Sequence, residues 1–288
     1  MTGLIVEGGA SRTYFAVGVM DAMMEADILI DYLGGASAGI SNAMNYATRQ
    51  IGRGLKIGTT EVPKKEYSAV KHLFNPKNRS LYNIDYVFKK VPDEIVPYDY
   101  EKFAEFKGYA EAAVTNVDTG EAEYIKIQNP LKGWDILVAS CSLPIMFPIA
   151  KINGKKYMDG GIADSVPFER AIEAGCDKII VILSRERSYV KGKSKSEEIS
   201  SFIFRKYPLF AKALKNRSKM YNAQRKELFR LEKEGKAFVI APEDTSDWKR
   251  TENNADKIKK MYDEGYSMGK SLIPSIKKYM ETNYENIN

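Results

Sequence analysis

The chain has 288 residues, of which 44% are hydrophobic and 28% are charged, and it carries a formal net charge of +6 at pH 7. This composition argues against a disordered chain and is typical of a soluble globular protein with a sizeable core. The longest strongly apolar run, Ile179 to Leu183, is much shorter than the roughly 18 apolar residues of a membrane-spanning helix. We therefore expect any contact with a membrane to be peripheral.

The first predicted strand, Gly3 to Val6, lies almost at the first residue. The basic leader and apolar core of a signal peptide have no room before it, so we expect a cytoplasmic protein. The two cysteines, Cys141 and Cys176, do not have the spacing of metal ligands. They are expected to be free, buried thiols.

The first half of the chain alternates strands with helices. After the first strand we predict a helix over Tyr14 to Ala26, a strand over Tyr32 to Gly35 and a helix from Ala38 to about Gln50. This alternation predicts an α/β fold with a parallel sheet. Residues 52 to 82 are rich in Gly, Lys, Pro and Asn, and predict an irregular excursion with one short helix over Glu66 to Leu73.

The rest of the chain predicts two hairpins and a return to the strand and helix alternation. The predicted elements are, in order, strands over Tyr109 to Asn116 and Glu123 to Ile127, a helix over Trp134 to Cys141, a hairpin of Ile149 to Ile152 with Lys155 to Met158, a helix over Pro167 to Ala174, a strand over Lys178 to Ser184, a helix over Phe210 to Glu234, a strand over Ala237 to Ala241 and a helical region over Asn254 to Thr282. Pro274 is expected to kink or split the last helix. Because no linker separates these elements, we predict one domain over residues 1 to 288, with a core at about 4 to 184 and a helical, basic part at about 185 to 288.

The stretch from Arg185 to Lys226 contains 13 Lys and Arg residues against three Glu residues. A solvated helical surface explains such a stretch as well as an acidic partner does. Among acidic partners, a peripheral contact of residues 185 to 226 with anionic membrane lipid is favoured. Nucleic acid is not expected, because no recognised binding motif is present.

The segment Gly35-Ala36-Ser37-Ala38-Gly39 fits G-x-S-x-G between a predicted strand and a predicted helix. In many hydrolases this turn holds a nucleophilic serine, and Gly35 and Gly39 leave space for the sharp bend. The alternative is a glycine-rich turn in which Ser37 only caps the helix. A nucleophilic Ser37 needs a base, and the only histidine of the sequence, His72, is expected to be structural or exposed.

Two further glycine-rich sites flank predicted strands. Gly8, Gly9 and Ala10 follow the first strand, where backbone amides can form either a phosphate cradle or an oxyanion hole; the lack of a full G-x-G-x-x-G weakens the nucleotide alternative. Arg12 either positions this loop, attracts a phosphate headgroup or is a surface cation. The second site, Asp159-Gly160-Gly161, ends the second hairpin; it is either a turn or a source of a carboxylate, with Asp164 as a rival.

In this order, the three sites resemble those of the patatin-like phospholipase family. The segment Ala139 to Pro148 also resembles the family's A-S-x-x-x-P-x-x-F-P, and the resemblance covers about Leu4 to Ser184. Within the family, the segment Gln50 to Gly54 is similar to that of bacterial members. The sequence departs from the family's loop at Ala10 and Thr13, where glycines are usual. Alanine keeps the backbone amide, whereas Thr13 adds a branched side chain at the end of the loop.

The resemblance implies a three-layer α/β/α fold with a mainly parallel central sheet. It also implies a Ser37–Asp159 dyad, with Gly8, Gly9 and Ala10 as the oxyanion hole and Gly160 and Gly161 as motif glycines, acting without a metal or a cofactor on fatty acyl esters of phospholipids or related lipids. Two alternatives remain: a non-catalytic lipid or acyl-ligand binding protein on the same fold, and a thioesterase or acyltransferase that uses the same dyad. The oligomeric state is not predicted.

Overall fold

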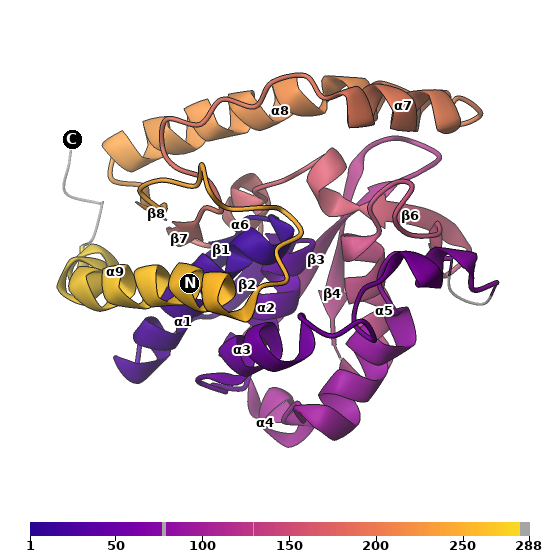
Figure 1. The fold of residues 1–288 in the computed structure, drawn as a ribbon. Helices are drawn as coiled ribbons and strands as arrows, with labels where there is room; N and C mark the ends of the chain where they lie inside the picture. Colours follow the sequence, from indigo (N-terminus) through magenta and orange to yellow (C-terminus); the bar gives the residue numbers. More distant parts are fainter. Residues whose placement is uncertain (77–78, 129, 283–288) are drawn as a thin grey trace.

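A computed structural model describes residues 1–76, 79–128 and 130–282 of the chain (Figure 1). Its centre is one eight-stranded sheet. The strands are β1 (Thr2–Val6), β2 (Tyr32–Ala36), β3 (Tyr109–Asn116), β4 (Ala122–Ile127), β5 (Ala150–Ile152), β6 (Lys155–Asp159), β7 (Lys178–Ile182) and β8 (Ala237–Ile240). Their order across the sheet is β5-β6-β3-β2-β1-β7-β8, and β4 also pairs with β3.

Most of the sheet is parallel. The pairs β3–β2, β2–β1, β1–β7 and β7–β8 are parallel. The strands β4 and β6 each pair with β3, and β5 pairs with β6, in antiparallel register. The carboxyl ends of the parallel strands therefore share one edge of the sheet, where ligands of open α/β folds bind. The predicted α/β class with a mainly parallel sheet is confirmed.

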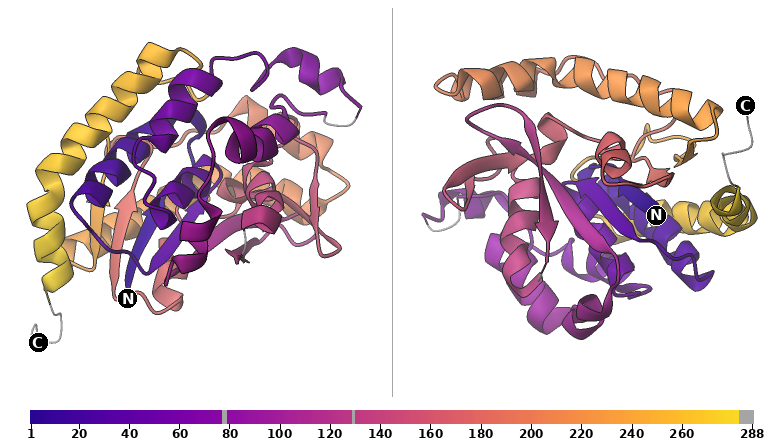
Figure 2. Two further views of the ribbon diagram at one scale, coloured as in Figure 1. Left: turned by 90° about the horizontal axis from the view of Figure 1, so that it is seen from below. Right: turned by 180° about the vertical axis from the view of Figure 1, so that it is seen from behind.

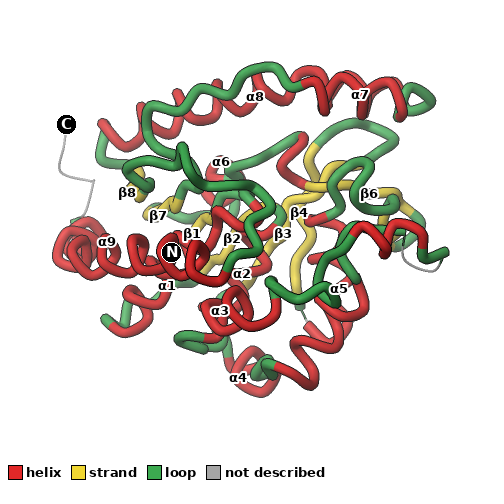
Figure 3. Tube along the Cα trace, viewed as in Figure 1, coloured by secondary structure: helices red, strands yellow, loops and turns green. Residues whose placement is uncertain are grey.

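Helices cover both faces of the sheet (Figures 1, 2 and 3). The α-helices are α1 (Tyr14–Glu25), α2 (Ala38–Ala47), α3 (Arg53–Lys56), α4 (Tyr100–Glu105), α5 (Pro130–Cys141), α6 (Phe168–Glu173), α7 (Lys195–Ile203), α8 (Pro208–Lys233) and α9 (Ala255–Glu281). In Figure 1, α7 and α8 cross the top of the molecule, and α1, α2 and α9 lie on the other side of the strands. This is the predicted three-layer arrangement.

The side chains of β1 show how the three layers are held together. Leu4 and Val6 belong to the core that contains α1, α2 and α9, whereas Ile5 belongs to the core that contains α6 and α8. All three side chains are fully buried. Because successive side chains of a strand point to opposite faces, one apolar strand stabilises both helical layers.

The structure differs from the predicted elements in several places. The predicted helix over Glu66 to Leu73 is wrong: Ser68 forms a β-bridge with Tyr82, and only a 3-10 turn over Val70–Phe74 follows. The short helices α3, α4 and α7 were not predicted, nor was the π-helical segment Tyr86–Ile95. The last helix is continuous through Pro274, so of the two predicted effects of Pro274, a kink or a split, the structure excludes the split.

Both cysteines are free, as predicted, although Cys141 is only partly buried. Within the described ranges, none of the helices combines the length and apolar composition needed to cross a bilayer.

Candidate active site

Ser37 occupies a tight turn between β2 and α2. Its backbone angles are φ 55° and ψ −136°, a conformation that residues other than glycine rarely adopt. The surrounding structure holds this strained turn: the Ser37 amide donates to Ser140 Oγ at 2.9 Å, and Ser140 Oγ donates to the Ala113 carbonyl at 2.7 Å. Ser37 is therefore fixed at the carboxyl edge of the sheet, with 8% of its surface exposed.

The motif glycines allow the backbone around Ser37 to pack closely. A Cβ atom at Gly39 would lie 2.3 Å from the Val6 carbonyl oxygen, and one at Gly8 would lie 3.2 Å from the Ser37 Cβ atom. Gly35 and Gly160 also contact neighbouring backbone at distances that exclude a side chain. The loop after β1 consequently lies directly against the serine.

This loop presents free amides. The Gly8 amide makes a long hydrogen bond of 3.4 Å to the Ser165 carbonyl, and the amides of Gly9 and Ala10 donate to none of the residues that the structure describes. Ala10 has a positive φ of 49°, which turns the loop at this point. The loop thus offers backbone donors of the kind that stabilise an oxyanion.

Thr13, which replaces a glycine usual in the family's loop, fastens the end of the loop. Its hydroxyl donates to the Ala10 carbonyl at 2.7 Å and accepts from Asn42 Nδ2 of α2 at 2.8 Å. Thr13 therefore ties the loop to the helix that begins after Ser37.

A buried carboxylate anchors the loop from the other side. Glu7 Oε2 accepts from the Ser184 amide at 2.7 Å, and Glu7 Oε1 accepts from the Tyr221 hydroxyl of α8 at 2.5 Å. Burial raises the pKa of Glu7, and these hydrogen bonds act in the opposite direction. The network connects the loop to a helix of the C-terminal third of the chain.

Asp159 ends β6 and lies in the same cavity as Ser37. Asp159 Oδ1 accepts from the Gly161 amide at 2.9 Å, whereas Oδ2 is buried and has no hydrogen-bond partner of standard geometry in the described part of the chain. Burial raises the pKa of Asp159, and Arg217 and the nearby Ser37 hydroxyl act in the opposite direction. The unpartnered oxygen is suited to accept a proton.

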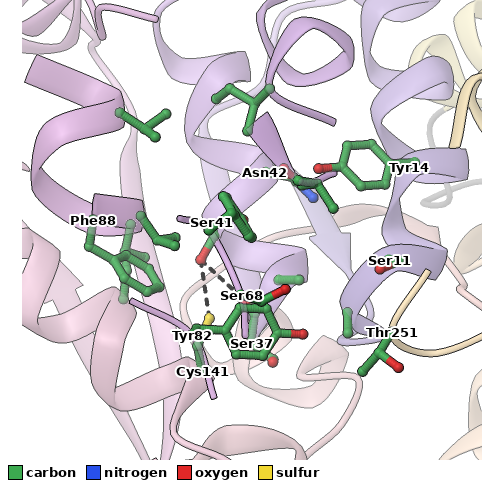
Figure 4. A pocket seen from close by; sticks show the side chains of 18 of the residues that line it. Ser11, Tyr14, Ser37, Ser41, Asn42, Ser68, Tyr82, Phe88, Cys141 and Thr251 are labelled. Carbon is green, nitrogen blue, oxygen red and sulfur yellow. Dashed lines mark hydrogen bonds between the residues drawn. The ribbon is translucent and has the colours of Figure 1, made fainter. Parts of the chain in front are cut away.

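Two cavities meet at Ser37, which lines both. The first, the apolar cavity, has a volume of about 190 Å³ and is lined by Val62, Val87, Phe88, Val91, Leu137, Leu143 and Phe147 among others. Figure 4 shows its wall near Ser37, where Ser41 contacts Cys141 at 3.4 Å. The second, the cationic cavity, has a volume of about 120 Å³ and is lined by Gly8, Gly9, Asp159 and Gly161 together with Arg12, Arg185, Lys191, Arg217 and Arg250.

The two cavities are lined by seven of the sequence-predicted site residues: Ser37, Asp159, Gly8, Gly9, Ala10, Arg12 and Gly161. The motif glycines Gly35, Gly39 and Gly160 line neither cavity and pack against neighbouring backbone instead. Asp164 and His72 also lie elsewhere. Asp164 accepts from Tyr124 and Gln224, each at 2.6 Å, and lines neither cavity. His72 also lies outside both cavities, where its Nε2 is 2.9 Å from the Lys65 carbonyl.

Sequence reasoning missed the anchoring role of Ser140 and the cations contributed by the C-terminal third. Ser140 lies in the A-S-x-x-x-P-x-x-F-P segment, so that segment was a signal for it. Arg217 lies in the basic stretch, but its position beside Asp159 depends on how α8 crosses the sheet. In residues 1–76, 79–128 and 130–282, no three His, Cys, Asp or Glu side chains gather as a metal site would require.

Two family models match the chain. The model described as patatin-like phospholipase matches residues 4–172, and one described as a domain of unknown function, DUF6363, matches residues 207–281. The chain is 25% identical over 190 residues to the uncharacterized protein YjjU of Escherichia coli, which covers 62% of this chain and 50% of YjjU. It is 27% identical over 192 residues to the lysophospholipase NTE1 of Meyerozyma guilliermondii, covering 62% of this chain and 12% of NTE1.

The chain thus spans half or less of the length of these relatives. A solved structure, that of VipD from Legionella pneumophila, aligns with 95% of this chain and 67% of the VipD chain, with a TM-score of 0.47 and 11% sequence identity.

Proposed function

Because the chain belongs to the patatin-like phospholipase family, we propose that it is a serine acyl hydrolase that cleaves fatty acyl esters of phospholipids or related lipids. One observation carries the proposal. Ser37, in a strained turn, lies where the apolar cavity meets a cavity that contains Asp159 and a loop with free amides. A nucleophile, a base and oxyanion donors are thus gathered at one point.

In the proposed reaction Ser37 Oγ attacks the ester carbonyl and Asp159 accepts the serine proton. The bond to the alcohol breaks, Asp159 returns the proton to the departing oxygen, and an acyl-serine remains. Water then attacks the acyl-serine, giving its proton to Asp159, and the released Ser37 recovers it. A buried carboxylate with a raised pKa is a better base than an exposed aspartate.

The amides of Gly9 and Ala10 hold the negative oxygen of the tetrahedral intermediate, and the weakly bonded Gly8 amide is a third donor. Removing one such donor from a hydrolase typically costs about 2.7 to 4 kcal/mol of transition-state stabilisation. The apolar cavity receives the acyl chain, since its lining of Val, Phe and Leu side chains matches a hydrocarbon.

The basic stretch at 185 to 226 is the proposed site of peripheral contact with an anionic membrane. Four apolar side chains are at least half exposed on α7 and the start of α8: Ile199, Phe202, Ile203 and Leu209. Lysines and arginines accompany them, including Lys195, Arg205, Lys206 and Lys212. Apolar side chains among cations are typical of surfaces that bind lipid interfaces.

A fluorophosphonate probe, which labels activated serines, tests the function directly. We expect labelling and ester hydrolysis in the wild-type chain, none in Ser37→Ala, and a loss of at least about a hundredfold in hydrolysis in Asp159→Asn. Ser271→Ala is the control, because Ser271 is exposed on α9 and lines neither cavity.

Three results would count against the proposal. A folded wild-type chain that neither reacts with the probe nor cleaves any acyl ester would favour a non-catalytic binding protein. Hydrolysis that survives in Ser37→Ala would remove the site assignment. Loss of hydrolysis in His72→Ala, with the fold retained, would replace the dyad by a triad.

A further inference from the structure

The cationic cavity contains five basic side chains from separate parts of the chain. Arg12 follows the loop after β1, Arg185 and Lys191 follow β7, Arg217 lies on α8, and Arg250 precedes α9. Four of these five lie outside the residues matched by the patatin-like phospholipase model. The cavity is therefore completed by the C-terminal third of the chain.

The five basic side chains of the cavity outnumber the carboxylates with which they form ion pairs in the described structure. Glu197 lies 3.3 Å from Lys191 Nζ and 3.7 Å from Arg217, so one carboxylate serves two cations. Glu186 is the acidic contact of Arg185, and it is 3.9 Å away.

Arg12 and Arg250 form no ion pair with any residue in the described ranges; Arg12 instead donates from Nε to the Trp248 carbonyl at 3.1 Å. The two carboxylates that line the cavity are Asp159, which is the proposed base, and Glu7, which is occupied by Ser184 and Tyr221. The cavity thus keeps a positive excess next to Ser37.

Arg185 has a hydrogen-bond donor that is available to a ligand. Its guanidinium stacks on the Tyr189 ring at 3.9 Å from the ring centroid, and its Nε atom is buried without a hydrogen-bond partner in the described structure. A buried donor without a partner destabilises the folded chain, and a bound acceptor would remove that cost. The stacked ring holds this donor in place.

The cations also repel one another. The pKa of Arg12 is lowered by burial and then by Arg185 and Arg250, and the pKa of Lys191 is lowered by burial and then by Arg217. Such mutual repulsion is relieved when an anion binds between the groups.

We propose that the cationic cavity binds the phosphate monoester of the substrate, so that the enzyme acts on acyl esters whose alcohol carries a terminal phosphate. The inference rests on the proposed function, because it assigns the alcohol side of the ester cleaved at Ser37. The acyl chain lies in the apolar cavity and the phosphate in the cationic cavity, with the ester carbonyl at Ser37 where the two cavities meet.

Charge and size favour a phosphate monoester over a phosphate capped by a cationic alcohol. A monoester carries close to two negative charges at neutral pH and three acceptor oxygens, which planar guanidinium groups bind in pairs. A quaternary ammonium group would add positive charge to a cavity of about 120 Å³ that already has an excess. We therefore expect discrimination against choline esters of the phosphate.

The test compares three short-chain substrates that remain monomeric: 1-hexanoylglycerol 3-phosphate, 1-hexanoylglycerol and 1-hexanoylglycero-3-phosphocholine. In the wild-type chain we expect the lowest KM for the phosphate monoester, by about tenfold or more. Arg185→Gln and Arg250→Gln should each raise that KM about tenfold and leave kcat/KM for the neutral ester nearly unchanged. Lys249→Gln is the matched control, because Lys249 is an exposed neighbour of Arg250 that does not line the cavity.

Inorganic phosphate distinguishes a headgroup site from a site for the free ion. It should inhibit hydrolysis of the phosphate monoester competitively. It should also raise the Tm of the wild-type chain, but not the Tm of the double variant that carries both Arg185→Gln and Arg250→Gln. Equal KM values for the phosphate monoester and the neutral ester, together with this Tm shift, would overturn the headgroup assignment and leave a free-phosphate site. Equal losses on both esters in the arginine variants would show that these cations serve the chemistry or the fold.

The same measurements separate this inference from the proposed function. If no ester is hydrolysed, the function fails, while the phosphate-dependent Tm shift still reports on the cavity. If esters are hydrolysed without preference for phosphate and without a Tm shift, the function stands and the phosphate site is wrong.

Discussion

Asp159 combines burial with a neighbouring cation, and this combination predicts the pH dependence of the reaction. Burial raises the pKa of Asp159, and Arg217 is the largest influence that lowers it. As the proposed base, Asp159 has to be ionised, so kcat/KM should fall as the pH drops through the pKa of Asp159. That loss should begin above the pH expected for a free aspartate, whose pKa is about 3.9.

Arg217→Gln removes the opposing cation and should move the acidic limb of the profile to higher pH. The measurement is kcat/KM for 1-hexanoylglycerol from pH 4 to pH 8, since this neutral substrate has no phosphate to titrate. Lys219→Gln, an exposed change on the same helix, should leave the limb in place. An acidic limb that does not move in Arg217→Gln would show that Asp159 does not set it.

At the scale of residues, the sequence predicted the parts of the candidate site that lie in short motifs. Ser37, Asp159 and the loop of Gly8 to Ala10 could be named as candidates because the proposed chemistry needs fixed local neighbours, such as glycines at a sharp turn. Arg250 carries no such local signal. It reaches the cavity through the packing of the chain before α9, which depends on contacts distant in sequence.

At the scale of elements, α7 is the clearest candidate for membrane contact. Phe202 is 68% exposed and Ile203 is 50% exposed, and neither packs in any core of the described residues. Replacing both by Ser should weaken binding to phosphatidylglycerol vesicles by at least about tenfold, because each side chain buried in lipid is worth about 1.5 to 3 kcal/mol. Cosedimentation with vesicles measures this binding.

The control for α7 is Ile172→Ser, since Ile172 on α6 is also exposed, at 45%, but lies outside the basic stretch. Binding should fall with added salt and should be weaker for phosphatidylcholine vesicles. Equal binding of the wild-type chain to both lipids would contradict the assignment of this helix. Binding of the double variant that equals binding of the wild-type chain would contradict it as well.

Elements with strong apolar periodicity were predicted well, and those shaped by distant contacts were not. The segment Glu66 to Leu73 has a helical pattern, yet Ser68 pairs with Tyr82, and the Tyr67 and Tyr82 rings pack 6.1 Å apart beside the apolar cavity. These tertiary contacts override local helix propensity. The helix α7 was missed for a different reason: it is mostly polar and its apolar side chains face outward.

At the scale of the whole molecule, the C-terminal third is joined to the rest through the sheet and the site. β8 pairs with β7, α9 packs along α1, and α8 supplies Tyr221 to the carboxylate of Glu7. If these contacts make the chain one cooperative domain, as its sequence predicts, both parts must unfold together.

The two tryptophans allow this to be measured, because each reports on a different part. Trp134 lies on α5 and donates to the Tyr100 hydroxyl at 2.9 Å, whereas Trp248 lies between β8 and α9, with its ring 6.0 Å from that of Phe15. Trp134→Phe and Trp248→Phe therefore leave single reporters of the C-terminal third and of the motif-bearing core, respectively. In urea, each variant should give a fluorescence midpoint equal to its own circular dichroism midpoint.

Comparison within each variant removes the effect of the substitution itself, since both probes then report on the same destabilised chain. Coincident transitions in both variants mean that the part matched by the patatin-like model and the part matched by DUF6363 unfold as one unit. A Trp248 transition that precedes loss of the circular dichroism signal would instead divide the chain into two domains. In that case the cationic cavity would open before the core unfolds, because Arg217 and Arg250 would leave with the C-terminal part.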